Sequence, residues 1–133
     1  MKQWNGLPEK ISIVAERLKD VQIENRPALQ VIARYNRPDV LIYADPPYLL
    51  ETRNGPIYDN EMTDADHTQL LEALAVHPGP VFLSGYDNSL YNECLSGWHR
   101  QERQQTIETG QSRTEVLWIN PAAAGQVGQM QLF

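Results

Sequence analysis

The chain has 133 residues, of which 41% are hydrophobic and 21% charged, which leaves room for one compact domain and excludes two full ones. Acidic residues outnumber basic ones by 17 to 11, and the formal charge of −6 is the opposite of the basic surface expected of a free-standing nucleic-acid binder. No apolar run approaches the roughly 20 residues needed to cross a bilayer, and there is no signal-peptide pattern, so we expect a cytoplasmic protein with no membrane contact. Cys94 is the only cysteine; we expect it to be buried, and we expect no metal site.

The first third of the chain predicts two helices that lead into a buried strand. The first helix is predicted to begin at Pro8 and to end near Asp20, because the apolar residues between them recur at helical spacing. A short strand is expected at residues 21–23, and Pro27 opens a second helix. Residues 40–44 are apolar throughout and follow a helix-breaking proline, which is typical of a buried strand.

The rest of the chain continues this alternation. A loop of about eighteen residues follows the buried strand, and loops of that length are usually functional or disordered. Thr63 and Asp66 then resemble a capping box that begins a third helix. The remaining predicted elements are a strand at 81–83, a short helix at about 88–95, and a hairpin of strands at about 99–107 and 114–119. This order predicts an α/β fold with a mostly parallel sheet and a terminal antiparallel pair.

The residues that follow the buried strand form the most informative motif. Asp45, Pro46, Pro47 and Tyr48 lie beyond the carboxyl end of that strand, where parallel sheets bind ligands. The two prolines hold the backbone extended and remove two amide donors, which leaves a rigid corner rich in acceptors. A carboxylate and a neighbouring carbonyl can both accept from one amino group, and Tyr48 offers a flat face to a planar ring. The corner therefore predicts a site for an exocyclic amine; the alternative is a proline-rich turn with a surface tyrosine.

The strand with its Asp-Pro-Pro-Tyr corner resembles the catalytic motif of amino-methyltransferases that use S-adenosyl-L-methionine (AdoMet). The wider chain resembles the Dam-type DNA adenine methyltransferase family, which is common in phages and prophages. Besides the corner, the resemblance rests on residues 21–25, 58–67, 84–86 and 113–118. Together these segments extend over about residues 8–121.

The resemblance implies methyl transfer from AdoMet to the amine of an adenine that is flipped out of double-stranded DNA. Asp45 and the Pro46 carbonyl would hold the amine, Pro47 would keep the corner rigid, and Tyr48 would stack on the base. Asp45 would also lie near the positive sulfonium of AdoMet and so contribute to cofactor binding. The transfer is a direct displacement, in which positioning supplies most of the catalysis.

Four further residues are candidates, each with an alternative. Asn25 either contacts the adenine of the cofactor or serves a local turn. Tyr86 either lines the base pocket or packs on the next helix. Arg53 and Tyr58 lie in the long loop, where they either contact the base and the DNA backbone or are solvated side chains.

The resemblance also implies parts that we do not find in the sequence. Complete members have a glycine-rich cofactor turn, two further strands and a target-recognition domain, whereas Gly6 is the only glycine before Asp45. In the family strand order 3-2-1-4-5-7-6, residues 1–121 would supply strands 3, 4, 5, 6 and 7 of a partial Rossmann-like sheet, with the edge of strand 4 exposed. We therefore expect the C-terminal catalytic half of such an enzyme. It would be inactive alone, would bind DNA weakly, and would self-associate or pair with a complementing half.

Residues 122–133 are rich in alanine, glycine and glutamine, and predict a flexible tail. Gln129, Leu132 and Phe133 resemble the peptide by which bacterial replication proteins dock on the sliding clamp; the alternative is an inert terminus. Two other functions stay open. One is a non-enzymatic assembly module, either a complementing half or a remnant tethered to the clamp. The other is an amino-methyltransferase that acts on RNA or protein.

Overall fold

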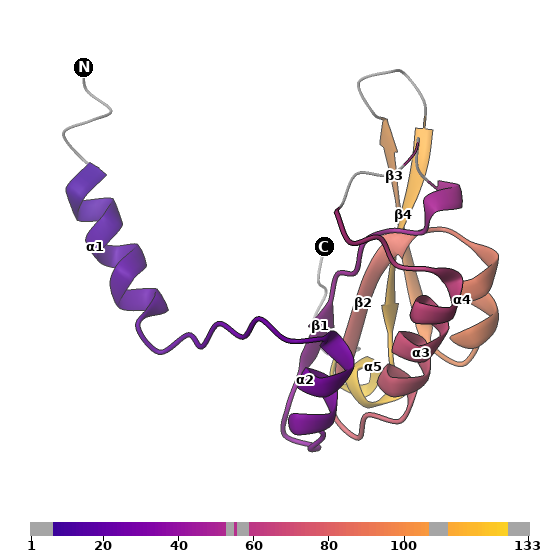
Figure 1. Ribbon diagram of the computed structural model, residues 1–133, viewed down its shortest axis with the longest axis horizontal. Coiled ribbons are helices and arrows are strands. Elements are labelled where there is room, and N and C mark those ends of the chain that lie inside the picture. Colours follow the sequence, from indigo (N-terminus) through magenta and orange to yellow (C-terminus); the bar gives the residue numbers. More distant parts are fainter. Residues whose placement is uncertain (1–6, 53–54, 56–58, 107–111, 128–133) are drawn as a thin grey trace.

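The computed structural model describes residues 7–52, 55, 59–106 and 112–127 (Figure 1). Its helical elements are α1 (Leu7–Leu18), α2 (Ala28–Arg34), the 3-10 turn η1 (Leu50–Thr52), α3 (Asp64–Ala75), α4 (Ser89–Cys94) and α5 (Pro121–Val127). Its strands are β1 (Ile42–Ala44), β2 (Val81–Tyr86), β3 (His99–Thr106) and β4 (Ser112–Ile119). The four helices predicted from the sequence are confirmed as α1 to α4.

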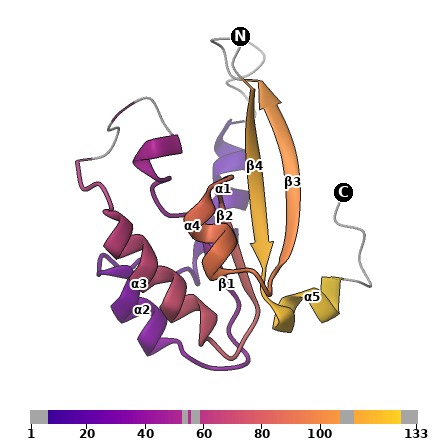
Figure 2. The same ribbon diagram turned by 90° about the vertical axis from the view of Figure 1, so that its right-hand side faces the viewer.

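The four strands form one sheet in the order β1-β2-β4-β3 (Figure 2). β1 runs parallel to β2, whereas β4 is antiparallel to both β2 and β3. The α/β class and the terminal antiparallel pair are confirmed. The prediction of a mostly parallel sheet is wrong, because the second strand of the hairpin returns between β2 and β3. The observed order is the one that the resemblance implies for strands 4, 5, 7 and 6.

The strand predicted at residues 21–23 does not form. Val21 and Ile23 are 56% and 94% exposed, and the backbone runs extended between α1 and α2 (Figure 1). A strand needs a neighbour that accepts and donates its backbone hydrogen bonds, and the described residues place none beside this segment. The sheet therefore has four strands and not five in the described part of the chain.

The core lies between the sheet and helices α2, α3 and α4, which cover one side of it (Figure 2). Its fully or almost fully buried side chains are Leu49, Leu70, Leu71, Leu74, Val81, Leu83, Tyr91, Leu95, Val116 and Trp118. Because strand residues alternate between faces, Tyr43, Ser84 and Leu117 lie on the opposite face of the sheet. That face carries the cavity described below.

Helix α3 begins as the sequence predicts. The backbone N–H of Asp66 donates to the Thr63 hydroxyl over 3.2 Å, and the Asp66 carboxylate accepts from the N–H of Thr63 over 2.8 Å. This reciprocal pair confirms the capping box. Leu70, Leu71 and Leu74 of the same helix are buried as expected. The cap thus fixes where the long loop after β1 ends.

The segment after β4 is helical, although the sequence predicts a flexible tail from residue 122. Asn120 is buried, and its Oδ1 accepts from the N–H groups of Val81 and Ala123 over 2.9 and 3.0 Å. Its Nδ2 donates to the Gly79 carbonyl over 2.9 Å. The buried amide therefore ties the start of α5 to β2 and orders this segment through Val127. The division of the chain into residues 1–121 and 122–133 stays a prediction.

Three further features concern chemistry outside the candidate site. Cys94 is exposed, so the prediction of a buried cysteine is wrong; it ends the short helix α4, whose buried side carries Tyr91. Within the described ranges, no helix is both long and apolar enough to span a bilayer. The same residues hold no group of three or more His, Cys, Asp or Glu side chains placed to bind a metal ion.

Candidate active site

The Asp-Pro-Pro-Tyr corner lies directly after the carboxyl end of β1. Asp45 is exposed, and the two prolines and Tyr48 are half-buried. The next residue, Leu49, is only 4% exposed and packs into the core. Its carbonyl accepts from the N–H of Thr52 over 3.0 Å and from the Thr52 hydroxyl over 2.7 Å, which closes turn η1. The corner is thus held by the strand before it and by a buried side chain after it.

Ser84 of β2 holds the carboxylate of Asp45. The Ser84 hydroxyl lies 2.9 Å from Asp45 Oδ1 and 3.3 Å from the carbonyl oxygen of Ala44. The contact follows from parallel pairing, since Ala44 lies opposite Leu83 and the next residues of the two segments, Asp45 after β1 and Ser84 within β2, are therefore neighbours. Among the described residues no group donates to Oδ2 of Asp45, so this oxygen can accept from a ligand.

Three side chains from β2, β4 and the corner form a row beside Asp45. The ring centroids of Tyr48 and Tyr86 are 4.6 Å apart, and the rings meet edge to face at 75°. The guanidinium of Arg113 lies 5.2 Å from the centroid of the Tyr86 ring. The row therefore places flat aromatic surfaces next to the carboxylate, with a positive charge at its far end.

Tyr48 remains a neutral phenol over the physiological range. Burial raises the pKa of Tyr48 to about 12, and the negative charges of Asp45 and Glu115 act in the same direction. The Ser84 hydroxyl opposes these effects. Tyr48 can therefore stack on a ring or donate a hydrogen bond, but it cannot serve as a base at neutral pH.

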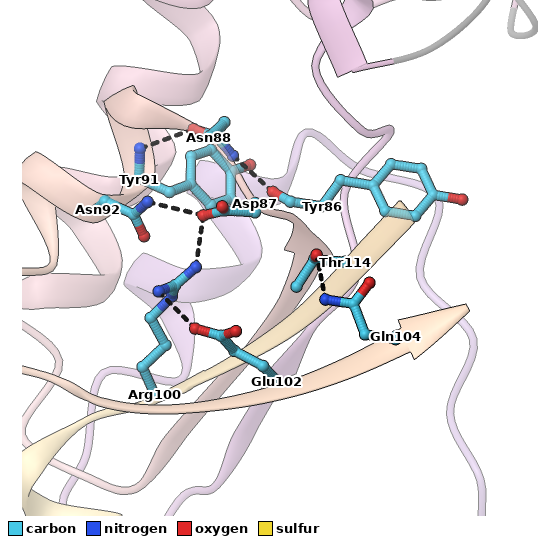
Figure 3. Close-up of polar contacts among 9 residues, drawn as sticks. All are labelled: Tyr86, Asp87, Asn88, Tyr91, Asn92, Arg100, Glu102, Gln104 and Thr114. Carbon is cyan, nitrogen blue, oxygen red and sulfur yellow. Dashed lines mark hydrogen bonds and ion pairs between the residues drawn. The ribbon is translucent and has the colours of Figure 1, made fainter. Parts of the chain in front are cut away.

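The start of α4 fixes the backbone of Tyr86 (Figure 3). Asn88 Nδ2 donates to the Tyr86 carbonyl, and Asn88 Oδ1 accepts from the N–H of Tyr91, both over 2.8 Å. The intervening Asp87 carboxylate accepts a hydrogen bond and ion pair from Arg100 on β3. Figure 3 shows the ring of Tyr86 pointing away from these contacts. The network holds the main chain while the ring stays available on the side of the corner.

A cavity of about 710 Å³ opens beside Asp45 on the face of the sheet opposite the core. It is lined by Tyr43, Asp45, Tyr48, Ser84, Gly85 and the residues 101–103 and 115–117 of the hairpin. A second cavity of about 420 Å³ is lined by Glu51, Thr52, Tyr86, Asp87, Arg113 and Thr114. Both volumes fall in the range of small-molecule sites. Asp45 and Tyr48 of the corner therefore line the larger cavity, and Tyr86 lines the smaller one.

The structure brings some of the predicted site residues together and separates another from them. Asp45 and Tyr48 line the larger cavity, and Tyr86 contacts Tyr48 and lines the smaller one. Asn25 is exposed before α2 and lines neither cavity. Its predicted contact with the cofactor stays a prediction.

Five predicted residues lie outside the described part of the chain. Arg53 and Tyr58 belong to the undescribed part of the loop after η1. Gln129, Leu132 and Phe133 follow the described end of α5. The contacts predicted for the first two with DNA, and for the last three with a sliding clamp, stay predictions.

Two residues of the site were not singled out as candidates from the sequence. Ser84 could have been found, because it follows the predicted strand at 81–83 and neighbouring parallel strands end at the same edge. The residues next to Arg113 in the sequence do not indicate its place in the site. Its contact with Tyr86 depends on the antiparallel pairing that sets Tyr86 opposite Glu115.

Comparison with known proteins shows which family the chain resembles. The family model described as D12 class N6 adenine-specific DNA methyltransferase matches residues 2–109, which is more than half of the chain. The matched range includes the corner, Ser84 and Tyr86. No curated protein matches the chain.

Proposed function

The chain belongs to the D12 class N6 adenine-specific DNA methyltransferases, and we propose that its Asp-Pro-Pro-Tyr corner serves methyl transfer from AdoMet to the exocyclic amine of adenine in DNA. The observation that carries this proposal is the hydrogen bond from Ser84 to Asp45. It fixes the carboxylate through Oδ1 and leaves Oδ2 able to accept from a ligand. An amine with two hydrogens needs two acceptors close together, which Oδ2 and the Pro46 carbonyl supply.

The row formed by Tyr48, Tyr86 and Arg113 supports the assignment of a nucleobase as the substrate. Tyr48 has a neutral ring beside the carboxylate, and Tyr86 extends the surface toward Arg113. Flipping an adenine out of a duplex costs a few kcal/mol, which stacking on such rings and hydrogen bonds to the amine can offset. The residues of the corner thus bind and orient the base, and none of them needs to form a covalent bond with it.

The larger cavity fits AdoMet in size and in charge. Its volume of about 710 Å³ suits a nucleoside-sized molecule, and the Asp45 carboxylate at its rim is opposite in charge to a sulfonium. Tyr43 of β1, Ser84 and Gly85 of β2, and Asp45 directly after β1 would face it. When bound, AdoMet supplies a methyl group on a positively charged sulfur atom. Asp45 then has two tasks, since it attracts that charge and holds the amine.

The finer features of the fold belong to the same proposal. The strand order supports a partial Rossmann-like sheet that holds strands 4 to 7 of the family order. The formal charge of −6 favours weak DNA binding by this chain alone. A location in the cytoplasm, where DNA is accessible, is consistent with the single cysteine. A second candidate function, an assembly module, is favoured by the outer edge of β1, which no strand of the described part of the chain covers.

The test is the identity of the methylated product. Because we expect this chain to be inactive alone, it is mixed with a complementing N-terminal half of a D12-class enzyme, tritiated AdoMet and unmethylated double-stranded DNA, and the DNA is digested to nucleosides for mass spectrometry. We expect label in N6-methyladenine, and calorimetry should show heat of AdoMet binding. Label in cytosine, RNA or protein would contradict the proposal. The absence of both heat of AdoMet binding and methyl transfer would favour the assembly module instead.

A further inference from the structure

Residues 7–23, which we call the arm, stand apart from the sheet and its helices (Figure 1). Every residue of the arm from Pro8 onward is exposed. It carries six of the eleven large hydrophobic side chains exposed in the described part of the chain, namely Ile11, Ile13, Val14, Leu18, Val21 and Ile23. Ile11, Val14 and Leu18 follow helical spacing and share one face of α1. An apolar surface of this extent marks a binding surface.

The outer edge of β1 is a second surface that the described residues leave uncovered. β1 pairs with β2 on one side, and the N–H of Ile42 donates to the Pro80 carbonyl over 2.9 Å. Because alternate residues of a strand direct their backbone groups to opposite sides, those of Tyr43 point to the outer edge. Leu41 and Tyr43 are 58% and 63% exposed. Such an edge is a template for another strand.

We propose that two copies of this chain form a two-fold dimer in which the arm of each copy covers the β1 edge of the other. Residues 21–23 then add as a strand beside β1, and α1 packs its apolar face next to Leu41 and Tyr43. The added segment matches β1 in length, and its Val-Gln-Ile sequence alternates as a strand requires. A two-fold exchange of arms covers the arm and the β1 edge of both copies. No surface of this kind is then left over in the described part of the chain to add a third copy.

The base of the arm is anchored in a way that favours exchange over pairing within one copy. Glu24 accepts a 2.7 Å hydrogen bond from the Tyr35 hydroxyl, and its carboxylate oxygens are 3.2 Å from Arg34 Nη1. Both partners lie at the C-terminal end of α2. The arm therefore leaves α2 in a fixed direction, and Figure 1 shows α1 far from the β1 edge of its own copy.

Surface area and charge both support a second copy as the occupant. The chain exposes 10053 Å², whereas a compact monomer of 15.2 kDa exposes about 7,100 Å². The arm contributes to this difference, since all of its residues from Pro8 to Ile23 are exposed, and a standard interface buries only roughly 800 Å² of each partner. Residues 7–20 carry three acidic and three basic side chains, so the helix of the arm is neutral in a chain whose formal charge is −6. Two acidic copies can thus meet through it without net repulsion.

The first test measures mass against concentration by light scattering, with the full chain. We expect twice the monomer mass at micromolar concentrations. Ile23→Glu should raise the dissociation constant at least about 100-fold, because it places a charge in the added strand. Val76→Glu is the matched control, since Val76 is 75% exposed at the end of α3 and lies outside the arm. It should change the constant by less than about threefold.

A cross-linking test identifies the surfaces. Two differently tagged copies in a Cys94→Ser background, one with Gln22→Cys and one with Tyr43→Cys, should form a disulfide between copies when oxidised, because the proposed pairing sets the central residues of the two segments opposite each other. Circular dichroism checks that each variant keeps its fold. A monomer up to about 100 µM would overturn the proposal. So would equal weakening by Val76→Glu, or cross-linking within a single copy that carries both cysteines.

Discussion

The Ser84 hydroxyl lies 2.9 Å from Oδ1 of Asp45 and joins β2 to the residue that follows its parallel neighbour β1. Through this contact the sheet sets the orientation of the carboxylate that follows β1. The two prolines fix the backbone of the corner, but without the Ser84 contact the Asp45 side chain would still rotate. The neighbouring strand β2 therefore supplies, through Ser84, the side-chain contact that the four-residue motif itself lacks.

Ser84→Ala should lower the rate of methyl transfer about 10- to 100-fold, because the Asp45 carboxylate loses the group that orients it. The free energy of unfolding should change by only about 1 kcal/mol, because the Ser84–Asp45 hydrogen bond lies beyond the carboxyl end of β1 and outside the core. Steady-state kinetics should show the loss mainly in kcat. Ser84→Thr keeps the hydroxyl and should restore most of the rate. A Ser84→Ala enzyme with unchanged kcat would refute the role given to this contact.

The stability of the protein should fall as the pH rises from about 10 to about 12. The pKa of Tyr48 is raised from 10.0 to about 12 in the folded state by burial and by the charges of Asp45 and Glu115. Above pH 10 the unfolded chain releases this proton first, so the folded state holds more protons and loses stability with rising pH. Burial also raises the pKa of Tyr91 and acts in the same direction. Urea unfolding at several pH values measures the slope.

In that measurement Tyr48→Phe is the informative variant. It removes the phenol but keeps the ring against Tyr86, so the alkaline loss of stability should become smaller without vanishing. The remaining loss belongs to Tyr91 and to Tyr35, whose pKa is raised by its hydrogen bond with Glu24. An identical slope in the wild type and in Tyr48→Phe would show that Tyr48 is not shielded from water as described.

Asn120→Ala should destabilise the protein by about 2–4 kcal/mol in urea unfolding. The Asn120 side chain makes three hydrogen bonds, to Val81, Ala123 and Gly79, and its loss leaves buried backbone groups without partners. Asn60 is exposed, so Asn60→Ala is the matched control and should stay within about 0.5 kcal/mol. Equal effects of the two substitutions would contradict the structural role of Asn120.

Gly79→Ala should cost at least about 2 kcal/mol, because the backbone must shift to admit a methyl group. A Cβ at residue 79 would lie 2.9 Å from His77 Nε2 and closer still to the Val40 carbonyl. That carbonyl is 2.8 Å from the same His77 nitrogen, so neither group can simply move away. Gly97→Ala meets no atom within 4 Å and should be nearly neutral. Thermal unfolding of the two variants gives the comparison.

Local patterns predicted the helices and the position of the corner, because these depend on residues close in the chain. The capping box of Thr63 and Asp66 is one example, and the corner at the end of β1 is another. Features that depend on distant partners were missed or wrong. Residues 21–23 have the composition of a strand, but within the described ranges no strand lies beside them to pair with. The helix after Asn120 forms because a buried amide joins it to β2, which no local pattern reveals.

The most direct test of the central claim is the rate of N6-methyladenine formation by Asp45→Ala relative to the wild type. Asp39→Ala is the matched control, because Asp39 is an exposed carboxylate paired with Arg37 at the other end of β1. If Asp45 holds the amine, its loss should lower the rate at least about 100-fold, and Asp39→Ala should keep the wild-type rate. An Asp45→Ala variant that forms N6-methyladenine as fast as the wild type would contradict the claim.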